Sequence, residues 1–179
     1  GTGTSNFNIG YMSSSVYCMD IAGASGSVVT YNVNYMTSQA TALYVHGEST
    51  ITGRIAILSS ATGIEMDNIG TSIVTNYIGM MSTYIYGIRH ISSVTTAISI
   101  YNIDYAFCGG DGSPFYVGLS PSNITLNMRM LLCSGDAFTL LDEQIIFDAN
   151  IQYITANNAL LSDSETNVRF NADYGVITT

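Results

Sequence analysis

The sequence contains no lysine, and only 9% of its 179 residues are charged. Four arginines stand against thirteen acidic residues, which gives a net charge of −9 at pH 7. Nucleic-acid binding depends on many basic contacts that release counterions from the phosphates, and anionic membrane surfaces also attract clusters of basic residues. The composition therefore argues against both partners. Neutral glycans remain compatible, whereas a charged glycan would need local basic groups such as Arg89.

The sequence also lacks any apolar run that approaches the ~20 residues needed to span a bilayer. The chain opens at Gly1, without a basic segment followed by an apolar stretch. We therefore expect no signal peptide, and a processed product or an excised fragment.

Cysteine is scarce as well, and Cys18, Cys108 and Cys133 have no metal-binding spacing. Each lies in or beside an apolar segment, so we expect all three to be buried as small hydrophobic residues. A disulfide between Cys108 and Cys133 stays open as an alternative. We expect no metal and no cofactor.

What the sequence does contain is an internal repeat. Residues 40–45 (ATALYV) return as residues 61–66 (ATGIEM), 21 positions later. A second apolar segment follows about eight residues on, as at 51–57, 73–78 and 94–100. These segments alternate apolar and polar residues, which is typical of a strand with one buried face. Short strands of this kind cannot bury their apolar faces alone, so the repeat predicts coils that stack on one another.

We therefore predict an all-β fold, a single-stranded right-handed parallel β-helix with about 21–22 residues per coil and six to eight coils. A β-sandwich would show hairpin signals every ~8–12 residues, and a leucine-rich repeat would show a Leu-x-x-Leu-x-Leu frame. Neither pattern occurs. One domain spans residues 1–179, with coils from about residue 14.

The repeat breaks at residues 108–122, which hold both prolines of the chain. We predict an inserted loop here that projects from one coil. Loops on rigid scaffolds often carry binding residues, so Asp111, Phe115 and Tyr116 are candidates.

The predicted register places most of the unusual polar residues on one outward row. If the apolar residues of 40–45 and 61–66 point inward, the residues between them point outward. The row then holds both histidines, two carboxylates and one of the four arginines across three coils. Its candidate ligand-binding residues are Tyr44, His46, Tyr86, Arg89 and His90, and its candidate catalytic residues are Glu65 and Asp67.

Glu65 and Asp67 lie two residues apart on one strand, so we expect their Cα atoms about 6.6–6.8 Å apart on one face. Glycoside hydrolases use carboxylate pairs about 5–5.5 Å apart for retention and about 6.5–9.5 Å apart for inversion. The spacing permits a hydrolase in which one carboxyl donates a proton and the other activates water. Two other interpretations stay open. His46 and Arg89 could neutralise the acids in an ion-pair ladder across coils, or the row could form a polar seam between subunits.

Tyrosine is the other excess, with thirteen residues and no tryptophan. We expect Tyr31 and Tyr77 to fill the core. Other rings face outward, where they suit stacking on sugars or a contact between subunits; these are Tyr44, Tyr86, Tyr101 and Tyr105.

The Ala-Thr-Gly-Ile start of the coil at 61–64, the corners rich in Asn, Thr and Gly, and the absence of lysine resemble right-handed parallel β-helix proteins. Within that group the chain is similar to the shaft of bacteriophage tailspike and preneck-appendage proteins, over about residues 14–179. The resemblance implies a homotrimer that binds, and often cleaves, host surface polysaccharides. No catalytic motif of the family is present, so the resemblance assigns no active-site residue.

Three hypotheses for function follow. The leading one is a viral tailspike-like host-attachment module, extracellular on the virion surface, that binds a cell-surface glycan. The second is a polysaccharide-degrading glycoside hydrolase, a depolymerase that uses Glu65 and Asp67. The third is a structural shaft or adhesin stalk without a ligand. The expected partners are a surface polysaccharide and two further copies of the chain, with no nucleic acid and no membrane insertion.

Overall fold

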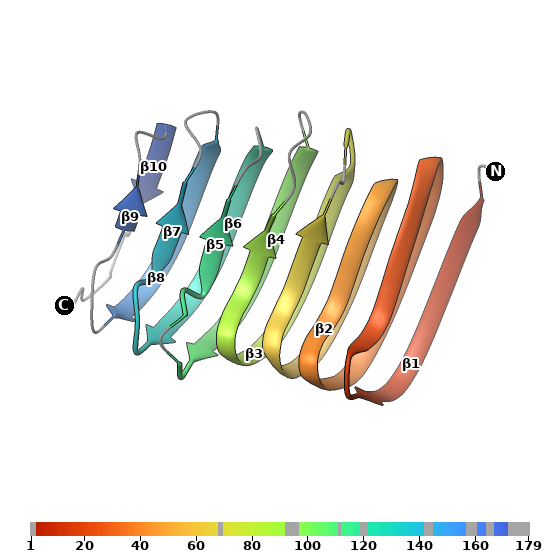
Figure 1. Ribbon diagram of the computed structural model, residues 1–179, viewed down its shortest axis with the longest axis horizontal. Helices are drawn as coiled ribbons and strands as arrows, with labels where there is room; N and C mark the ends of the chain where they lie inside the picture. The colour runs from red at the N-terminus through yellow and green to blue at the C-terminus, as the bar shows by residue number, and fades with distance from the viewer. Residues whose placement is uncertain are drawn as a thin grey trace.

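The computed structural model describes residues 3–67, 70–91, 97–110, 112–118, 122–141, 145–156, 161–163 and 167–171. These residues form strands and no helix. The strands stack side by side along one axis (Figure 1), and each pair of neighbouring strands is parallel. The chain is thus an all-β parallel solenoid of about six turns, which confirms the predicted fold class.

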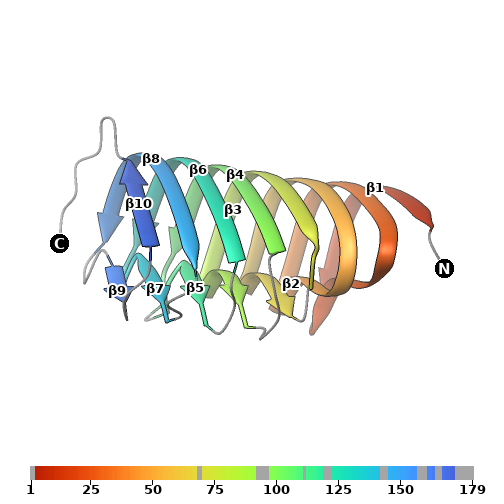
Figure 2. The ribbon, with the colours of Figure 1, turned by 90° about the horizontal axis from the view of Figure 1, so that it is seen from above.

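The described residues form ten strands, and the longest strand winds through more than one coil (Figures 1 and 2). Their bounds are β1 Thr4–Ser14, β2 Tyr17–Asp67, β3 Ile73–His90, β4 Ala97–Cys108, β5 Phe115–Val117, β6 Ser122–Cys133, β7 Phe138–Leu140, β8 Ile146–Ala156, β9 Leu161–Asp163 and β10 Asn167–Asn171.

Most coils contain more residues than the sequence repeat predicted. On one wall Thr4 pairs with Val28, and Ile73 pairs with Ile98. On the second wall Ile88 pairs with Phe115, and these two residues are further apart in the sequence than the partners in the other two pairs. Corners and connections between the strands take up the additional residues, while the strands themselves stay in register.

Alternation along each strand builds the core. The residues Ile55, Ile78, Ile103, Met128 and Ile151 form one inward column, each at most 4% exposed. The ribbon bends directly after this column, as the curved lower ends in Figure 1 show, because two successive residues point outward before the next one turns in. In β3 these two are Gly79 and Met80, and Met81 is buried.

The prediction for Tyr77 and Tyr101 was wrong. Tyr77 is 44% exposed, whereas Tyr101 is fully buried. The segment Ile73 to Ile78 has apolar residues in both phases of its alternation, so its own pattern does not choose between them. Pairing with Ile55 and Ile103 selects the phase that buries Ile78 and with it Asn76.

A register shift explains the error for His90. Ser60 pairs with Thr83 but Thr62 pairs with Tyr86, so β3 holds one more residue than β2 at this point. One additional residue reverses inward and outward positions beyond it. His90 therefore pairs with the inward Met66 and is 1% exposed, not outward as predicted.

The predicted loop 108–122 contains a strand of the solenoid. Strand β5 pairs with β3 on one side and β7 on the other, and Phe115 and Val117 are each 2% exposed. The two prolines and the glycines obscured a short strand whose apolar residues sit at core positions. Tyr116, between them, points outward and is half-buried.

The cysteines are free thiols. Cys108 and Cys133 are buried and pair in register on β4 and β6, and Cys18 is partly buried. Burial raises the pKa of Cys133 to about 12, so its thiol stays protonated at neutral pH.

Candidate functional site

Two outward surfaces stand out, and they lie on different parts of each coil. The first, here called the charged ladder, carries most of the residues singled out above; it consists of Tyr17, Asp20, Tyr44, His46, Glu65, Asp67, Tyr86, Arg89 and Tyr116. The second, here called the groove, crosses six coils on the wall formed by β2, β3, β4, β6 and β8, because β2 contributes both Asn32 and Arg54.

The N-terminal half of the charged ladder is closed by contacts among its own side chains. The Tyr44 hydroxyl donates to Asp67 Oδ2 at 3.0 Å, and the Tyr44 ring stacks on Tyr17 with 4.8 Å between centroids. Burial and the hydrogen bond to Asp67 raise the pKa of Tyr44 to about 12, so it remains a donor at neutral pH. His46 Nε2 lies 2.9 Å from Asp20 Oδ1, with both side chains exposed.

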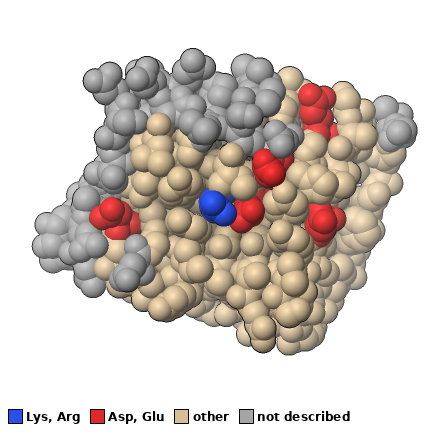
Figure 3. Space-filling model, in the orientation of Figure 1, with Lys and Arg blue, Asp and Glu red and all other residues tan. Residues whose placement is uncertain are grey.

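The C-terminal half centres on Arg89. Its guanidinium donates to Glu65 Oε2 at 3.4 Å and lies over the rings of Tyr86, 5.2 Å from the centroid, and Tyr116, 5.9 Å from the centroid. The Glu65 side chain is only 13% exposed. Figure 3 shows basic atoms against acidic ones at one place on this face, with further acidic patches around them.

The structure brings together most of the predicted row, namely Tyr44, His46, Glu65, Asp67, Tyr86 and Arg89, and adds Tyr116 from the predicted loop. Asp111 lies outside the described residues. The sequence did not predict Tyr17 and Asp20, which extend the row by one coil through their contacts with Tyr44 and His46. Each carboxylate of the row has a partner within the chain. Arg89 pairs with Glu65, as the ladder interpretation expected, whereas His46 pairs with Asp20 and not with Glu65 or Asp67.

His90 belongs instead to a polar seam inside the solenoid. Its Nε2 lies 2.8 Å from the Tyr101 hydroxyl, and burial lowers the pKa of His90 to about 4, so the ring is neutral at pH 7. Tyr101 pairs in register with the buried Asn76, whose Oδ1 accepts a hydrogen bond from Tyr31. The Tyr31 ring passes over Gly53, where a side chain would collide with it. The seam thus connects the strand that carries Arg89 with the opposite wall.

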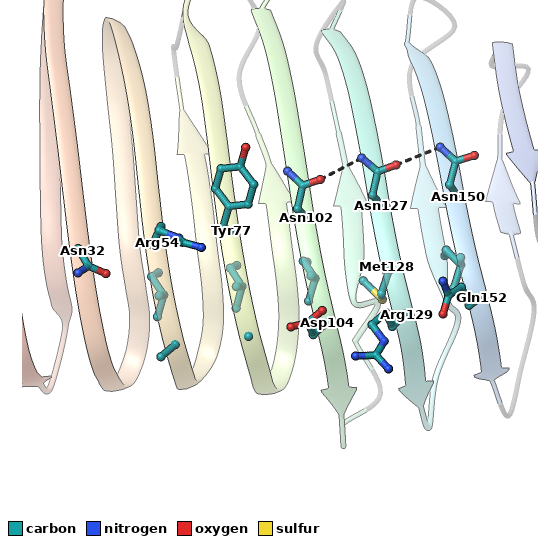
Figure 4. Close-up of a pocket in the computed structure, with 16 residues that line it drawn as sticks. Asn32, Arg54, Tyr77, Asn102, Asp104, Asn127, Met128, Arg129, Asn150 and Gln152 are labelled. Atoms are coloured by element: carbon teal, nitrogen blue, oxygen red, sulfur yellow. Dashed lines mark hydrogen bonds between the residues drawn. The ribbon is translucent and has the colours of Figure 1, made fainter.

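The groove has a volume of about 670 Å³, and side-chain amides line much of it. Asn102, Asn127 and Asn150 occupy one outward column on successive coils. Asn127 Nδ2 donates to Asn102 Oδ1, and Asn150 Nδ2 donates to Asn127 Oδ1, each at 3.1 Å (Figure 4). Tyr77 and Arg54 continue the same column on the two preceding coils.

A second column of the groove is parallel to the first, two residues further along each strand. It begins with the small residues Ala56 and Gly79 and continues with Asp104, Arg129 and Gln152. Ala56 and Gly79 line the groove with little side-chain volume beside Arg54 and Tyr77. The groove thus combines an exposed aromatic ring, amides and three exposed charged groups along the solenoid axis.

Sequence reasoning missed the groove because it searched for charge and histidine. A signal was nevertheless present, since an asparagine followed by Ile or Met recurs at residues 102, 127 and 150. Aligning these positions with one another, rather than at a fixed period, would have placed the three amides on one row.

No group of three or more His, Cys, Asp or Glu side chains suited to a metal ion occurs among the described residues. The described part of the chain likewise contains no helix that is long and apolar enough to cross a membrane.

The fold and these two surfaces define a parallel β-solenoid with an axial groove. Comparisons with known proteins add no narrower assignment, because no family model, no curated protein and no solved structure matches the chain.

Proposed function

We propose that this chain is a host-attachment module of the tailspike kind that binds a cell-surface glycan along the groove. The observation that carries the proposal is the open row of Asn102, Asn127 and Asn150 next to the exposed Tyr77 ring. The residues that would contact the glycan belong to the groove rather than to the charged ladder.

The bonds within the amide row leave some of its donor and acceptor groups unused. An asparagine amide offers two donor hydrogens and an oxygen with two lone pairs. The bonds within the row use one hydrogen of Asn127 and one of Asn150, and Asn102 donates neither of its hydrogens to another described residue, so both face a ligand unpaired. Sugar hydroxyls both donate and accept hydrogen bonds, and they match such a surface. Because the row repeats once per coil, at about 4.8 Å, it suits a polymer that lies along the solenoid axis.

Tyr77 adds the apolar contact that a sugar ring needs. Its ring is 44% exposed and lies on the coil next to Asn102. Arg54 lies over this ring, 5.8 Å from its centroid. Aromatic rings combine a large apolar face with little side-chain entropy to lose, so Tyr77 is the expected anchor of the site.

The proposal includes assembly into a homotrimer outside the cell, on the virion surface. An exposed apolar ridge runs beside the groove, with Tyr11, Met80, Tyr105 and Tyr153 each 36–63% exposed. Exposed apolar stripes of this kind mark contacts between proteins. Light scattering should give three times 19.2 kDa, and a monomer would contradict this part of the proposal.

Two other functions stay hypotheses. The hydrolase hypothesis uses Glu65 and Asp67, which accept bonds from Arg89 and Tyr44. In a cleavage assay Glu65→Gln should abolish cleavage and retain binding if that hypothesis holds. The stalk hypothesis predicts that the chain binds no glycan.

The experiment is a binding screen on immobilised bacterial surface polysaccharides with the wild-type protein, Tyr77→Ala and the matched control Tyr86→Ala. Both tyrosines are outward and both contact an arginine. We expect Tyr77→Ala to weaken binding at least about tenfold, as truncation of an aromatic anchor does, and Tyr86→Ala to bind like the wild type. Equal losses in both variants, or no binding by the wild type, would contradict the proposal.

A further inference from the structure

Three of the four arginines of the chain lie on the two surfaces described above, and their contacts differ. Arg89 of the charged ladder is paired with Glu65. Arg54 and Arg129 both line the groove, and neither has a carboxylate within 4.0 Å among the described residues. A chain with a net charge of −9 thus places in one groove two arginines that form no ion pair with the described acidic residues.

Aromatic rings hold both guanidinium groups in place. The Arg54 guanidinium lies 5.8 Å from the centroid of Tyr77, and that of Arg129 lies 5.5 Å from the centroid of Tyr105. Such cation–π contacts fix a guanidinium without neutralising its charge. Both arginines are exposed, so their donor groups remain available to a ligand.

We infer that the groove selects an acidic polysaccharide, with Arg54 and Arg129 each binding a carboxylate of the polymer. This inference rests on the proposed glycan-binding function and specifies its ligand. Planar guanidinium groups match carboxylates and form charge-assisted hydrogen bonds with them. A neutral glycan would leave both arginines unused.

The register also fixes the spacing of the two carboxylates. Arg54 pairs with Tyr77, Tyr77 with Asn102 and Asn102 with Asn127, which lies on the coil of Arg129. The two arginines are therefore three coils apart, or roughly 14 Å along the axis. The amides between them would contact the uncharged hydroxyls of the intervening sugars.

Asp104 is the remaining charged group of the groove and opposes the anion. It lies on the coil next to Arg129 in the same column, and it is exposed. Its carboxylate repels a polymer carboxylate bound at Arg129. The Arg54 subsite is therefore the stronger of the two, and removing the Asp104 charge should strengthen binding of an acidic polymer.

The test compares each acidic polymer with its own neutral form. Alginate, hyaluronate and polysialic acid are immobilised beside carboxyl-reduced samples of the same chains and probed with the native protein. Arg54→Met and Arg129→Met are compared with the matched control Arg89→Met, and circular dichroism confirms that each variant is folded. Asp104→Asn is the fourth variant.

We expect binding to at least one acidic polymer that carboxyl reduction abolishes. Arg54→Met and Arg129→Met should each weaken it about tenfold or more, Arg89→Met should not, and Asp104→Asn should strengthen it. Raising the salt concentration should weaken it as well.

Equal binding of the acidic and the reduced polymer would overturn the inference and leave the proposed function standing. Unchanged binding by both Arg54→Met and Arg129→Met would do the same. Failure of all six samples to bind would contradict the proposed function, and the inference with it.

Discussion

The charged ladder and the groove differ in what their polar groups already bind. In the charged ladder Arg89 contacts Glu65, Tyr86 and Tyr116, so its charge and its donors have partners within the chain. In the groove Arg129 contacts a ring and no carboxylate among the described residues, and the amides of Asn102 and Asn150 keep unused groups. A concentration of charge thus marks a surface that stabilises the fold, whereas free hydrogen-bonding capacity marks a surface suited to a ligand.

The largest expected effect concerns the seam that connects the two regions, where His90 follows Arg89 and Tyr101 precedes Asn102. An unfolded histidine has a pKa near 6.5, whereas burial lowers that of His90 to about 4. The unfolded chain therefore binds the proton first, and stability falls as the pH drops from 6.5 towards 4. The expected loss is about 3 kcal/mol.

Urea unfolding of the wild type and His90→Gln between pH 7 and pH 4 measures this effect. The variant cannot titrate at residue 90, so its stability should fall less over this range. Parallel curves for the two proteins would show that His90 has no part in the acid sensitivity.

The second prediction concerns the wall behind the groove. Gly53 lies under the Tyr31 ring, whereas Gly10 has no neighbouring atom within 4 Å of where a Cβ would lie. Gly53→Ala should destabilise the chain by about 2 kcal/mol, as overpacking of a core does, and Gly10→Ala should change little. Equal effects of the two substitutions on thermal unfolding would contradict the packing of Tyr31 over Gly53.

The third prediction separates the arginines by their effect on stability. Arg89→Met leaves the Glu65 carboxylate, 13% exposed, without its partner, and we expect a loss of about 1–2 kcal/mol. Arg129→Met removes an exposed side chain without an ion pair among the described residues, so the change should stay within about 0.5 kcal/mol. The midpoints of urea unfolding at pH 7 measure both changes. Equal losses of stability in the two variants would mean that the charged ladder does not stabilise the fold.

The smallest expected effect is at the exposed end of the charged ladder. His46 and Asp20 lie 2.9 Å apart, but their side chains are 38% and 51% exposed. Asp20→Asn should lower the free energy of unfolding by less than about 1 kcal/mol, and added salt should reduce the difference further. A loss as large as that of Arg89→Met would contradict this prediction, because it would mean that the exposed end of the charged ladder stabilises the fold as much as the contacts of Arg89 do.

Much of the fold could be predicted because alternation within each segment indicates most of the buried positions. Leu43, Val45, Ile64 and Met66 are buried as their pattern indicated, and the residues between them point outward. What failed depended on pairing between coils. The register shift after Ser60 turned His90 inward. No pattern within one segment of the sequence indicates that a strand holds an additional residue.

The groove was missed for a related reason. Tyr77 was assigned to the core because either of two adjacent apolar residues could point inward there, and only the neighbouring coils choose Ile78. Because the prediction turned Tyr77 inward, it contained no outward column of residues at this position of the coils. The charged ladder was predictable because charges are rare in this chain, but rarity does not reveal whether a charge already has a partner.

The most direct test of the account is to map the bound glycan by NMR. The side-chain amide signals of Asn102, Asn127 and Asn150 are recorded while a polysaccharide that binds the protein is added. The account predicts that these signals shift and that the guanidinium signal of Arg89 stays in place. Shifts at Arg89 and in the rings of Tyr44 and Tyr86, with the three asparagines unchanged, would contradict it and assign binding to the charged ladder.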